Sequence, residues 1–117
     1  MINRPIKIDT HNAVVLATAP LMMIVPYVLT FDPAVGLISF FLGAALMGVA
    51  LSGISPNRTL PASAIAGFDW ALGLTIFAIG IVSGLSGQSI FTTIFLVGFG
   101  AAHLALAAST RYGSRGA

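Results

Sequence analysis

Two ionisable side chains, those of Asp69 and His103, stand in stretches of the sequence that are otherwise almost entirely apolar. Carboxylates and imidazoles are the groups that proteins commonly use for general acid–base catalysis, proton transfer and metal binding. An ionisable group inside a membrane segment is costly unless it is paired, and such groups often mark functional sites. These two residues are therefore the first candidates for chemistry.

Other chemistry has little support in the sequence. The chain has no cysteine, which excludes thiolate catalysis and thiolate metal sites. Its serines form no evident arrangement with His and Asp, and its glycines are spread along the chain instead of forming a phosphate-binding loop. His11 is expected just outside the first membrane span, which leaves His103 as the single intramembrane histidine. We predict no enzyme, no catalytic residue and no metal site.

The amino-acid composition indicates whether water or lipid surrounds these residues. Of the 117 residues, 57% are hydrophobic and 7% are charged, whereas soluble domains carry about 25% charged residues. The mean hydropathy is +1.02. Only five basic and three acidic side chains set the net charge of +2, so a basic nucleic-acid-binding face is not expected. The chain is predicted to be an all-α integral membrane protein with the lipid bilayer as its surroundings.

Four segments are long and apolar enough to cross a bilayer, which requires about 20 residues. They cover residues 12–30, 34–53, 62–83 and 88–109, and together they form a single transmembrane domain over 1–117. Asp32-Pro33 has the chemistry of a helix start, and polar, Pro- or Gly-bearing stretches separate the later spans. We therefore expect two tandem helical hairpins.

The basic residues predict the orientation of these spans. Arg4 and Lys7 precede the first span, Arg58 lies in the second loop, and Arg111 and Arg115 follow the fourth span. With four spans these regions share one side of the membrane, and the other two loops contain no Lys or Arg. The positive-inside rule then places both termini in the cytoplasm.

The two halves of the sequence resemble each other weakly. A shift of 55 residues aligns Gly43 with Gly98 and Ala50 with Ala105. Two hairpins joined by a cytoplasmic loop would form a parallel repeat about an axis along the membrane normal.

Small residues at helical spacing predict where helices approach closely. These are Ala44, Gly48 and Ser52 in the second span, Gly80 and Gly84 in the third, and Gly98, Ala101, Ala102 and Ala105 in the fourth. The ridges either pack inside a tight bundle or face another subunit or a second copy of the chain. Pro20 and Pro26 are expected to kink the first span.

The stretch GFDWALG, residues 67–73, shows how Asp69 could be accommodated. In an antiparallel hairpin Asp69 and His103 have almost the same height, about 10 Å inside the cytoplasmic ends of their helices. We predict a hydrogen bond or ion pair between them, with Trp70 as an anchor at the membrane interface. The pair could be structural, or it could serve proton transfer.

A resemblance to a known family rests on short motifs. Val25-Pro26-Tyr27 resembles the Ser-Pro-Trp step of the bacterial SPW repeat proteins, and Phe68-Asp69-Trp70, Ala102-His103-Leu104 and Thr110-Arg111-Tyr112 are also similar to members of that group. The Ser-Pro-Trp step is altered in both halves. The resemblance implies a duplicated protein of the bacterial inner membrane and brings no catalytic residues with it.

Three functions are compatible with these observations. The first is a non-enzymatic accessory or scaffold subunit of a larger respiratory or photosynthetic membrane complex. The second is a small transporter or proton-coupled carrier that uses Asp69 and His103. The third is a module that binds a pigment or quinone near His103; here Phe99 stands where bacterial antenna proteins have an alanine four residues before the histidine. No cofactor is required by the first two.

Overall fold

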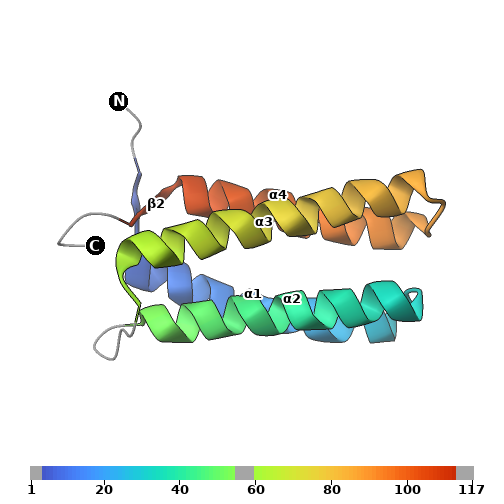
Figure 1. Ribbon diagram of the computed structural model, residues 1–117, viewed down its shortest axis with the longest axis horizontal. Helices are drawn as coiled ribbons and strands as arrows, with labels where there is room; N and C mark the ends of the chain where they lie inside the picture. The colour runs from blue at the N-terminus through green and yellow to red at the C-terminus, as the bar shows by residue number, and fades with distance from the viewer. Residues whose placement is uncertain (1–3, 55–59, 113–117) are drawn as a thin grey trace.

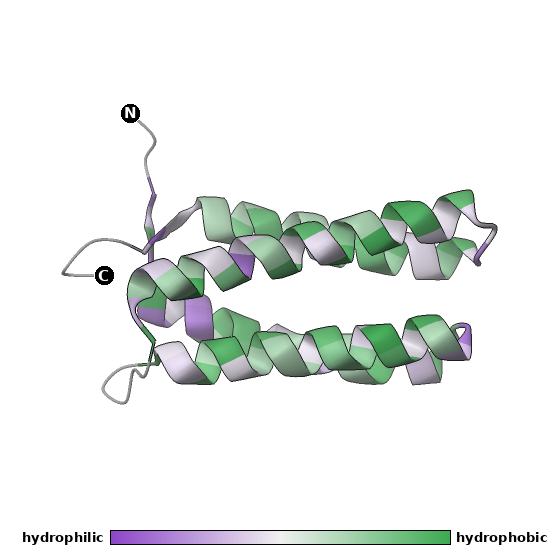
Figure 2. Cartoon of the chain, viewed as in Figure 1, coloured by the Kyte–Doolittle hydropathy of each residue, from purple (hydrophilic) through white to green (hydrophobic). Residues whose placement is uncertain are grey.

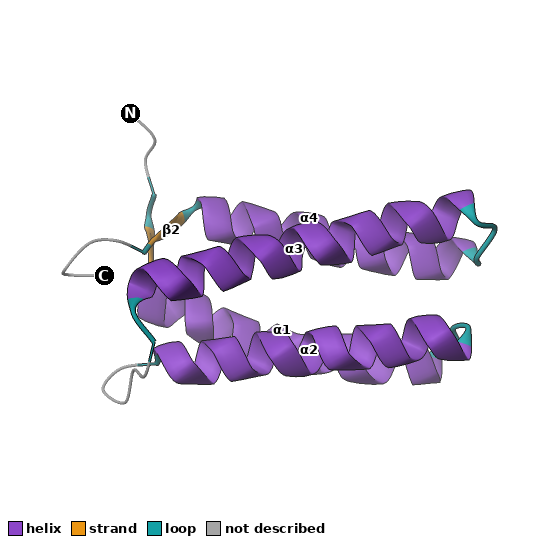
Figure 3. Cartoon of the chain, viewed as in Figure 1, coloured by secondary structure: helices purple, strands orange, loops and turns teal. Residues whose placement is uncertain are grey.

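The computed structural model describes residues 4–54 and 60–112 and contains four long helices (Figure 1). They are α1 (Ile8–Val28), α2 (Pro33–Gly53), α3 (Ala62–Leu85) and α4 (Ile90–Ala108). Two short strands, β1 (Ile6–Lys7) and β2 (Thr110–Arg111), flank the bundle in the chain (Figure 3). The all-helical fold with four spans is confirmed.

All four helices are long and apolar enough to cross a membrane. Figure 2 shows hydrophobic residues along the length of the bundle and hydrophilic ones gathered toward its ends. Arg58 and Arg115, on which the predicted orientation partly depends, lie outside the described residues. The cytoplasmic position of the termini therefore stays a prediction.

The second helix of each hairpin begins with a side-chain cap. The Asp32 carboxylate accepts a hydrogen bond from the Ala34 backbone nitrogen at 2.9 Å, with Pro33 at the first helical position. The Ser89 hydroxyl accepts from the Thr92 backbone nitrogen at 3.3 Å. These caps satisfy helix N–H groups that have no partner within their own helix.

The turns of the two hairpins coincide at a spacing of 57 residues. Thr30 and Gly87 both have positive φ, 53° and 82° respectively. The caps Asp32 and Ser89 follow two residues after each of them. Both turns lie at the same end of the bundle (Figure 1). The halves thus share one backbone plan and run in the same direction, as a parallel repeat does.

This spacing corrects the 55-residue shift inferred from the sequence. At 57 residues Gly43 corresponds to Gly100, and both are buried. A Cβ atom on Gly43 would lie 2.9 Å from the Cβ of Met22, and one on Gly100 would lie 2.6 Å from the backbone nitrogen of Phe77. Gly98, the match at 55 residues, is exposed with open space at its Cβ position. The 55-residue shift therefore pairs two glycines, Gly43 and Gly98, that lie on different faces of their helices.

Each helix packs mainly against its own hairpin partner, α1 against α2 and α3 against α4. Apolar side chains from all four helices form one core cluster between the hairpins. Its fully buried members include Met22, Leu46, Ile76 and Leu96. This core holds the two hairpins together, while the close glycine contacts fix the two helices within each hairpin.

The two prolines of α1 lie within a continuous helix from Ile8 to Val28. Proline cannot donate a backbone hydrogen bond, so Pro26 leaves the carbonyl of Met22 without its usual partner four residues later. The Ser39 hydroxyl of α2 donates to this carbonyl at 2.6 Å. Pro26 therefore creates an acceptor that joins α1 to α2.

The two ends of the described chain meet beside the start of α1. β1 pairs in parallel with β2, with Ile6 opposite Thr110 and Lys7 opposite Arg111. The Ile6 backbone nitrogen also donates to the Ser109 carbonyl at 3.1 Å. This pairing brings the residues that follow α4 over the first turns of α1.

Candidate functional site

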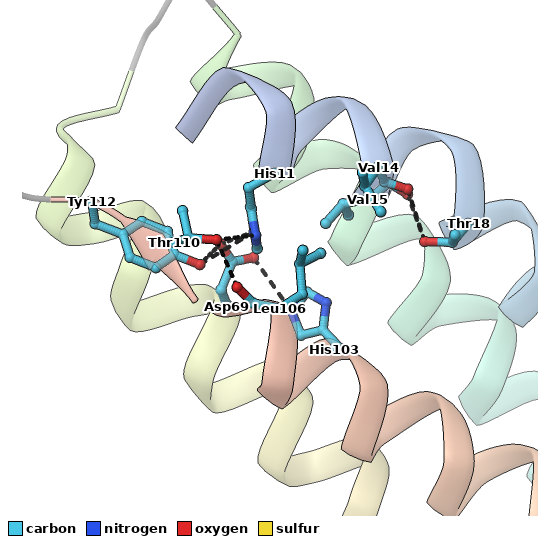
Figure 4. Close-up of polar contacts among 9 residues, drawn as sticks. All are labelled: His11, Val14, Val15, Thr18, Asp69, His103, Leu106, Thr110 and Tyr112. Atoms are coloured by element: carbon cyan, nitrogen blue, oxygen red, sulfur yellow. Dashed lines mark hydrogen bonds and ion pairs between the residues drawn. The ribbon is translucent and has the colours of Figure 1, made fainter. Parts of the chain in front are cut away.

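Five polar side chains gather where the β1–β2 pair covers the helix ends, and we call them the Asp69 cluster (Figure 4). They come from α1, α3, α4 and the segment after α4, and they are His11, Asp69, His103, Thr110 and Tyr112. All five are buried. The cluster joins both hairpins and both ends of the described chain.

Asp69 is the centre of this cluster, and only 1% of it is exposed. Its Oδ2 atom accepts hydrogen bonds from His11 Nε2 at 2.7 Å and from the Tyr112 hydroxyl at 2.8 Å. Its Oδ1 atom lies 3.5 Å from His103 Nε2. A buried carboxylate is stable when neighbouring donors replace water in this way.

His11 is held through both of its ring nitrogens. While Nε2 faces Asp69, Nδ1 lies 3.0 Å from the Thr110 hydroxyl oxygen. That hydroxyl also lies 2.6 Å from the Leu106 carbonyl, to which it donates. The His11 ring is thereby held between the Asp69 carboxylate and a hydroxyl that is itself bound to the end of α4.

The predicted pair of Asp69 and His103 is present, but as the weaker of the two histidine contacts. His11 was expected just outside the first span at residues 12–30, but the helix begins earlier: α1 starts at Ile8 and includes His11. The rings of His11 and His103 are 5.8 Å apart. The sequence was misleading here because the polar residues around His11 resemble a segment outside the membrane.

Tyr112 closes the cluster from the segment after α4. Its hydroxyl donates to Asp69 and lies 3.2 Å from His11 Nε2. Burial, followed by the neighbouring Asp69 carboxylate, raises the pKa of Tyr112 well above its usual value. The phenol therefore stays protonated and keeps its donor role. Sequence reasoning assigned it no role, since its contact depends on the pairing of β1 with β2.

His103 differs from the other members of the Asp69 cluster because its Nε2 atom has no hydrogen-bond partner among the described residues. The residue is only 5% exposed. The 3.5 Å separation from Asp69 is long for a direct bond. Asn12 is the other buried side chain in the described segments with unpartnered polar atoms; it packs against Gly53.

No group of three or more His, Asp or Glu side chains in the described residues has the geometry to hold a metal ion. What the cluster does offer is a connected set of hydrogen-bonding groups around one carboxylate. Such a set can fix the positions of helices, and it can also exchange protons among its members.

The remaining predicted site residues lie apart from this cluster. Trp70 is on the outer surface of α3 and is 38% exposed, as an interfacial anchor requires. Pro20 is half-buried and Pro26 is buried within α1.

The predicted small-residue ridges divide into three groups. Gly80 and Gly84 face α4, where added Cβ atoms would lie 2.7 Å from Val97 and 3.1 Å from Thr93. Ala44 and Ser52 are half-buried on α2. The others are exposed and do not form the inner helix contacts: Gly48, Gly98, Ala101, Ala102 and Ala105. Besides Gly80, close packing inside the hairpins involves Gly43 and Gly100, neither of which was assigned to a predicted ridge.

Comparison of the chain with protein-family models, curated proteins and solved structures finds no match. The resemblance to SPW repeat proteins stays a prediction.

Proposed function

We propose that this membrane protein is a non-enzymatic accessory or scaffold subunit of a larger bacterial membrane complex, either respiratory or photosynthetic. The observation that carries the proposal is the outward position of the small residues on α4. Gly98, Ala101 and Ala105 are exposed in the chain by itself. A second membrane helix could approach this face closely, and close approach is what drives helix association in lipid.

The use of the Asp69 cluster supports the same proposal. The Asp69 carboxylate receives two hydrogen bonds and a third, longer contact from within the chain. The oxygen atoms of Asp69 are thus largely occupied by side chains from α1, α4 and the segment after α4. This arrangement suits a clasp that fixes the shape of a subunit.

A proton-coupled carrier using Asp69 and His103 is the alternative from another class. It requires a polar cavity that reaches Asp69 from the cytoplasm. Among the described residues, the cavity beside the cluster lies between α1 and α4 with mostly apolar walls, and Asp69 is not part of its lining. The geometry therefore favours the scaffold, and intact transport phenotypes in an Asp69→Asn strain would count further against the carrier.

The scaffold is tested by mild extraction of tagged protein from its native membrane, followed by mass spectrometry. We expect stoichiometric partner subunits with the wild type and their loss with Gly98→Leu, which blocks close approach. The Gly98 side-chain position is open within the chain, so the substitution leaves the fold intact. Ala78→Leu, on the exposed surface of α3, is the matched control and should retain the partners.

The outcomes separate the possibilities cleanly. Protein that elutes alone and monodisperse contradicts the proposal. Recovery of a second, differently tagged copy of the chain would indicate self-association through the same face. Equal recovery of partners with Gly98→Leu and the wild type would show that another face is used.

A further inference from the structure

The pairing of β1 with β2 brings two cations from opposite ends of the described chain next to each other. Lys7 lies opposite Arg111 in the parallel register, one position along from Ile6 and Thr110. Residues paired on neighbouring strands are about 5 Å apart, and their side chains point to the same face. Thr110 and Tyr112 are buried, whereas Arg111 between them is exposed, as Lys7 is. The two cations therefore share the outer face of the strand pair.

This position is unfavourable for two like charges. Cations that lie directly opposite each other on neighbouring strands destabilise the pairing of the strands. Neither Lys7 nor Arg111 forms an ion pair with a described residue. A negative charge that contacts both cations would remove their repulsion and would hold β1 and β2 together.

The acidic side chains of the chain do not supply this negative charge. There are three of them. Asp69 is buried in its own cluster, Asp32 caps α2 at the opposite end of the bundle, and Asp9 is exposed in the first turn of α1. One exposed carboxylate at this end therefore faces a surface with more cations than it can neutralise.

A third cation adds to the positive charge of this surface. Burial and the Asp69 carboxylate raise the pKa of Tyr112, and the positive charge of Arg4 partly opposes them. Arg4 is thus close to the segment that carries Arg111, and it is exposed. The excess of positive charge favours a negatively charged ligand from outside the chain.

The strand pair lies where the membrane-spanning helices begin and end. Lys7 immediately precedes α1, and Arg111 is three residues beyond Ala108, the last residue of α4. Both helices are candidate spans. Figure 3 shows the two strands at the end of the bundle opposite the hairpin turns. Cations at the end of a span extend toward the headgroups while their aliphatic stems stay over apolar surface. The phosphate layer of the bilayer therefore lies directly beside this pair.

We propose that Lys7 and Arg111 together bind the phosphate of an anionic phospholipid at this surface. The planar guanidinium of Arg111 matches two phosphate oxygens, and the Lys7 ammonium adds a compact charge. The bound phosphate removes the repulsion between the two cations, so it also stabilises the pairing of β1 with β2. A zwitterionic phospholipid binds more weakly, because its own ammonium group is repelled by the same cations.

The test uses the purified full-length chain in mild detergent, without partner subunits. Dioleoyl phosphatidylglycerol is titrated as the anionic probe and dioleoyl phosphatidylcholine as the zwitterionic one, and native mass spectrometry counts the bound lipids. The ionic strength is about 0.15 M, so that attraction between exposed charges more than about 8 Å apart is largely screened. We expect one phosphatidylglycerol molecule to bind at least about tenfold more tightly than phosphatidylcholine.

Three variants make the result specific to the strand pair. Lys7→Gln and Arg111→Gln should each weaken phosphatidylglycerol binding at least about tenfold, since each loses a charge-assisted contact with the phosphate. Arg4→Gln removes the same charge from the same end but lies outside the paired register, so it is the matched control. It should weaken binding less than about threefold. All three side chains are exposed, and circular dichroism verifies that the variants fold.

A second measurement follows the strand pair itself in a bilayer. The Ile6 backbone nitrogen donates to the Ser109 carbonyl at 3.1 Å. Hydrogen exchange at this amide should be severalfold slower in phosphatidylglycerol nanodiscs than in phosphatidylcholine nanodiscs. Arg111→Gln should remove the difference between the two lipids, and Arg4→Gln should retain it.

Equal affinities for the two lipids would overturn the proposal. Equal losses of affinity in Arg4→Gln and Arg111→Gln would also overturn it, because they would show that net charge alone attracts the lipid. Both measurements use the chain by itself. Their failure is therefore distinguishable from failure of the scaffold proposal, which is tested by partner recovery with Gly98→Leu.

Discussion

The Nε2 atom of His11 in α1 lies 2.7 Å from the Oδ2 atom of Asp69 in α3, although 58 positions separate the two residues in the chain. This contact joins the first helix of one hairpin to the first helix of the other. From the segment after α4, Thr110 contacts His11, and Tyr112 contacts both His11 and Asp69. The hairpins are thus held together by polar groups at one end and by apolar packing along the rest of their length.

Replacement of Asp69 should destabilise the bundle strongly. Asp69→Ala leaves three buried donors facing an apolar side chain, and we expect a loss of about 3–5 kcal/mol in the free energy of unfolding. Asp69→Asn keeps the shape and should cost less. Denaturant unfolding in micelles, followed by circular dichroism, measures both. Asp32→Asn is the matched control, because Asn is an equally good N-cap for α2; equal losses at both positions would contradict the clasp.

The Tyr112 contact predicts a dependence on alkaline pH. The pKa of Tyr112 is raised in the folded protein by burial and by Asp69, so the protonated form is favoured by folding. Its contribution to stability is fully present below the unfolded pKa of about 10 and is lost as pH rises beyond it toward the folded pKa. Tyr112→Phe should lower stability by about 1–2 kcal/mol at pH 7 and flatten this loss.

Unfolding measured between pH 8 and pH 12 tests this expectation, with absorbance of the phenolate as a second readout. Tyr27→Phe is the control, because Tyr27 is exposed on α1 and far along the chain from the cluster. An identical pH profile in Tyr112→Phe and the wild type would disprove the role assigned to the hydroxyl.

The Ser39–Met22 bond should depend on Pro26. In the wild type Ser39→Ala leaves the Met22 carbonyl without a donor, at a cost of about 1 kcal/mol. In a Pro26→Ala background the backbone N–H of residue 26 can donate to the same carbonyl. The cost of Ser39→Ala should then fall by half or more. A double-mutant cycle of unfolding free energies measures this coupling, and strict additivity of the two substitutions would refute it.

The two nearby glycines of α4 should respond oppositely to the same change. Gly100→Ala places a Cβ 2.6 Å from the Phe77 backbone nitrogen, so the hairpin must shift, at a cost of about 1–3 kcal/mol. Gly98→Ala meets open space and should be neutral or stabilising by up to about 1 kcal/mol. Thermal unfolding of the two variants compares them directly. Similar unfolding temperatures of the two variants would show that α3 and α4 can move apart at Gly100 without a loss of stability.

The orientation can be tested with single cysteines, since the chain has none of its own. Arg4→Cys should react with a membrane-impermeant maleimide only after the cytoplasmic side is exposed. Gln88→Cys, in the turn between α3 and α4, should react from the outer side of intact cells. The reverse labelling pattern would invert the topology inferred from the basic residues.

Local sequence was sufficient for the helices and their turns. Apolar segments of about 20 residues have few alternatives in a bilayer, because every backbone polar group must be satisfied within the segment. Asp32 and Pro33 placed the start of α2 within one residue of the observed boundary. The equal height of Asp69 and His103 also followed from counting residues along an antiparallel hairpin.

Tertiary structure decided which faces of these helices meet. The rotation of each helix depends on long-range packing, and Gly or Ala is present on several faces, so the sequence could not show that Gly100 is inside while Gly98 is outside. His11 reached Asp69 because α1 begins earlier than its hydropathy suggests, so that its first turns bring the imidazole to Asp69 of α3 at one end of the bundle. Tyr112 reached Asp69 because β2, which precedes Tyr112, pairs with β1 at the other end of the described chain. The sequence alone therefore determined the four candidate spans and the equal height of Asp69 and His103 along their hairpin. Only the packed structure determined which side chains contact Asp69. The physical reason is that local chemistry sets where a helix begins and ends, whereas long-range contacts set its rotation.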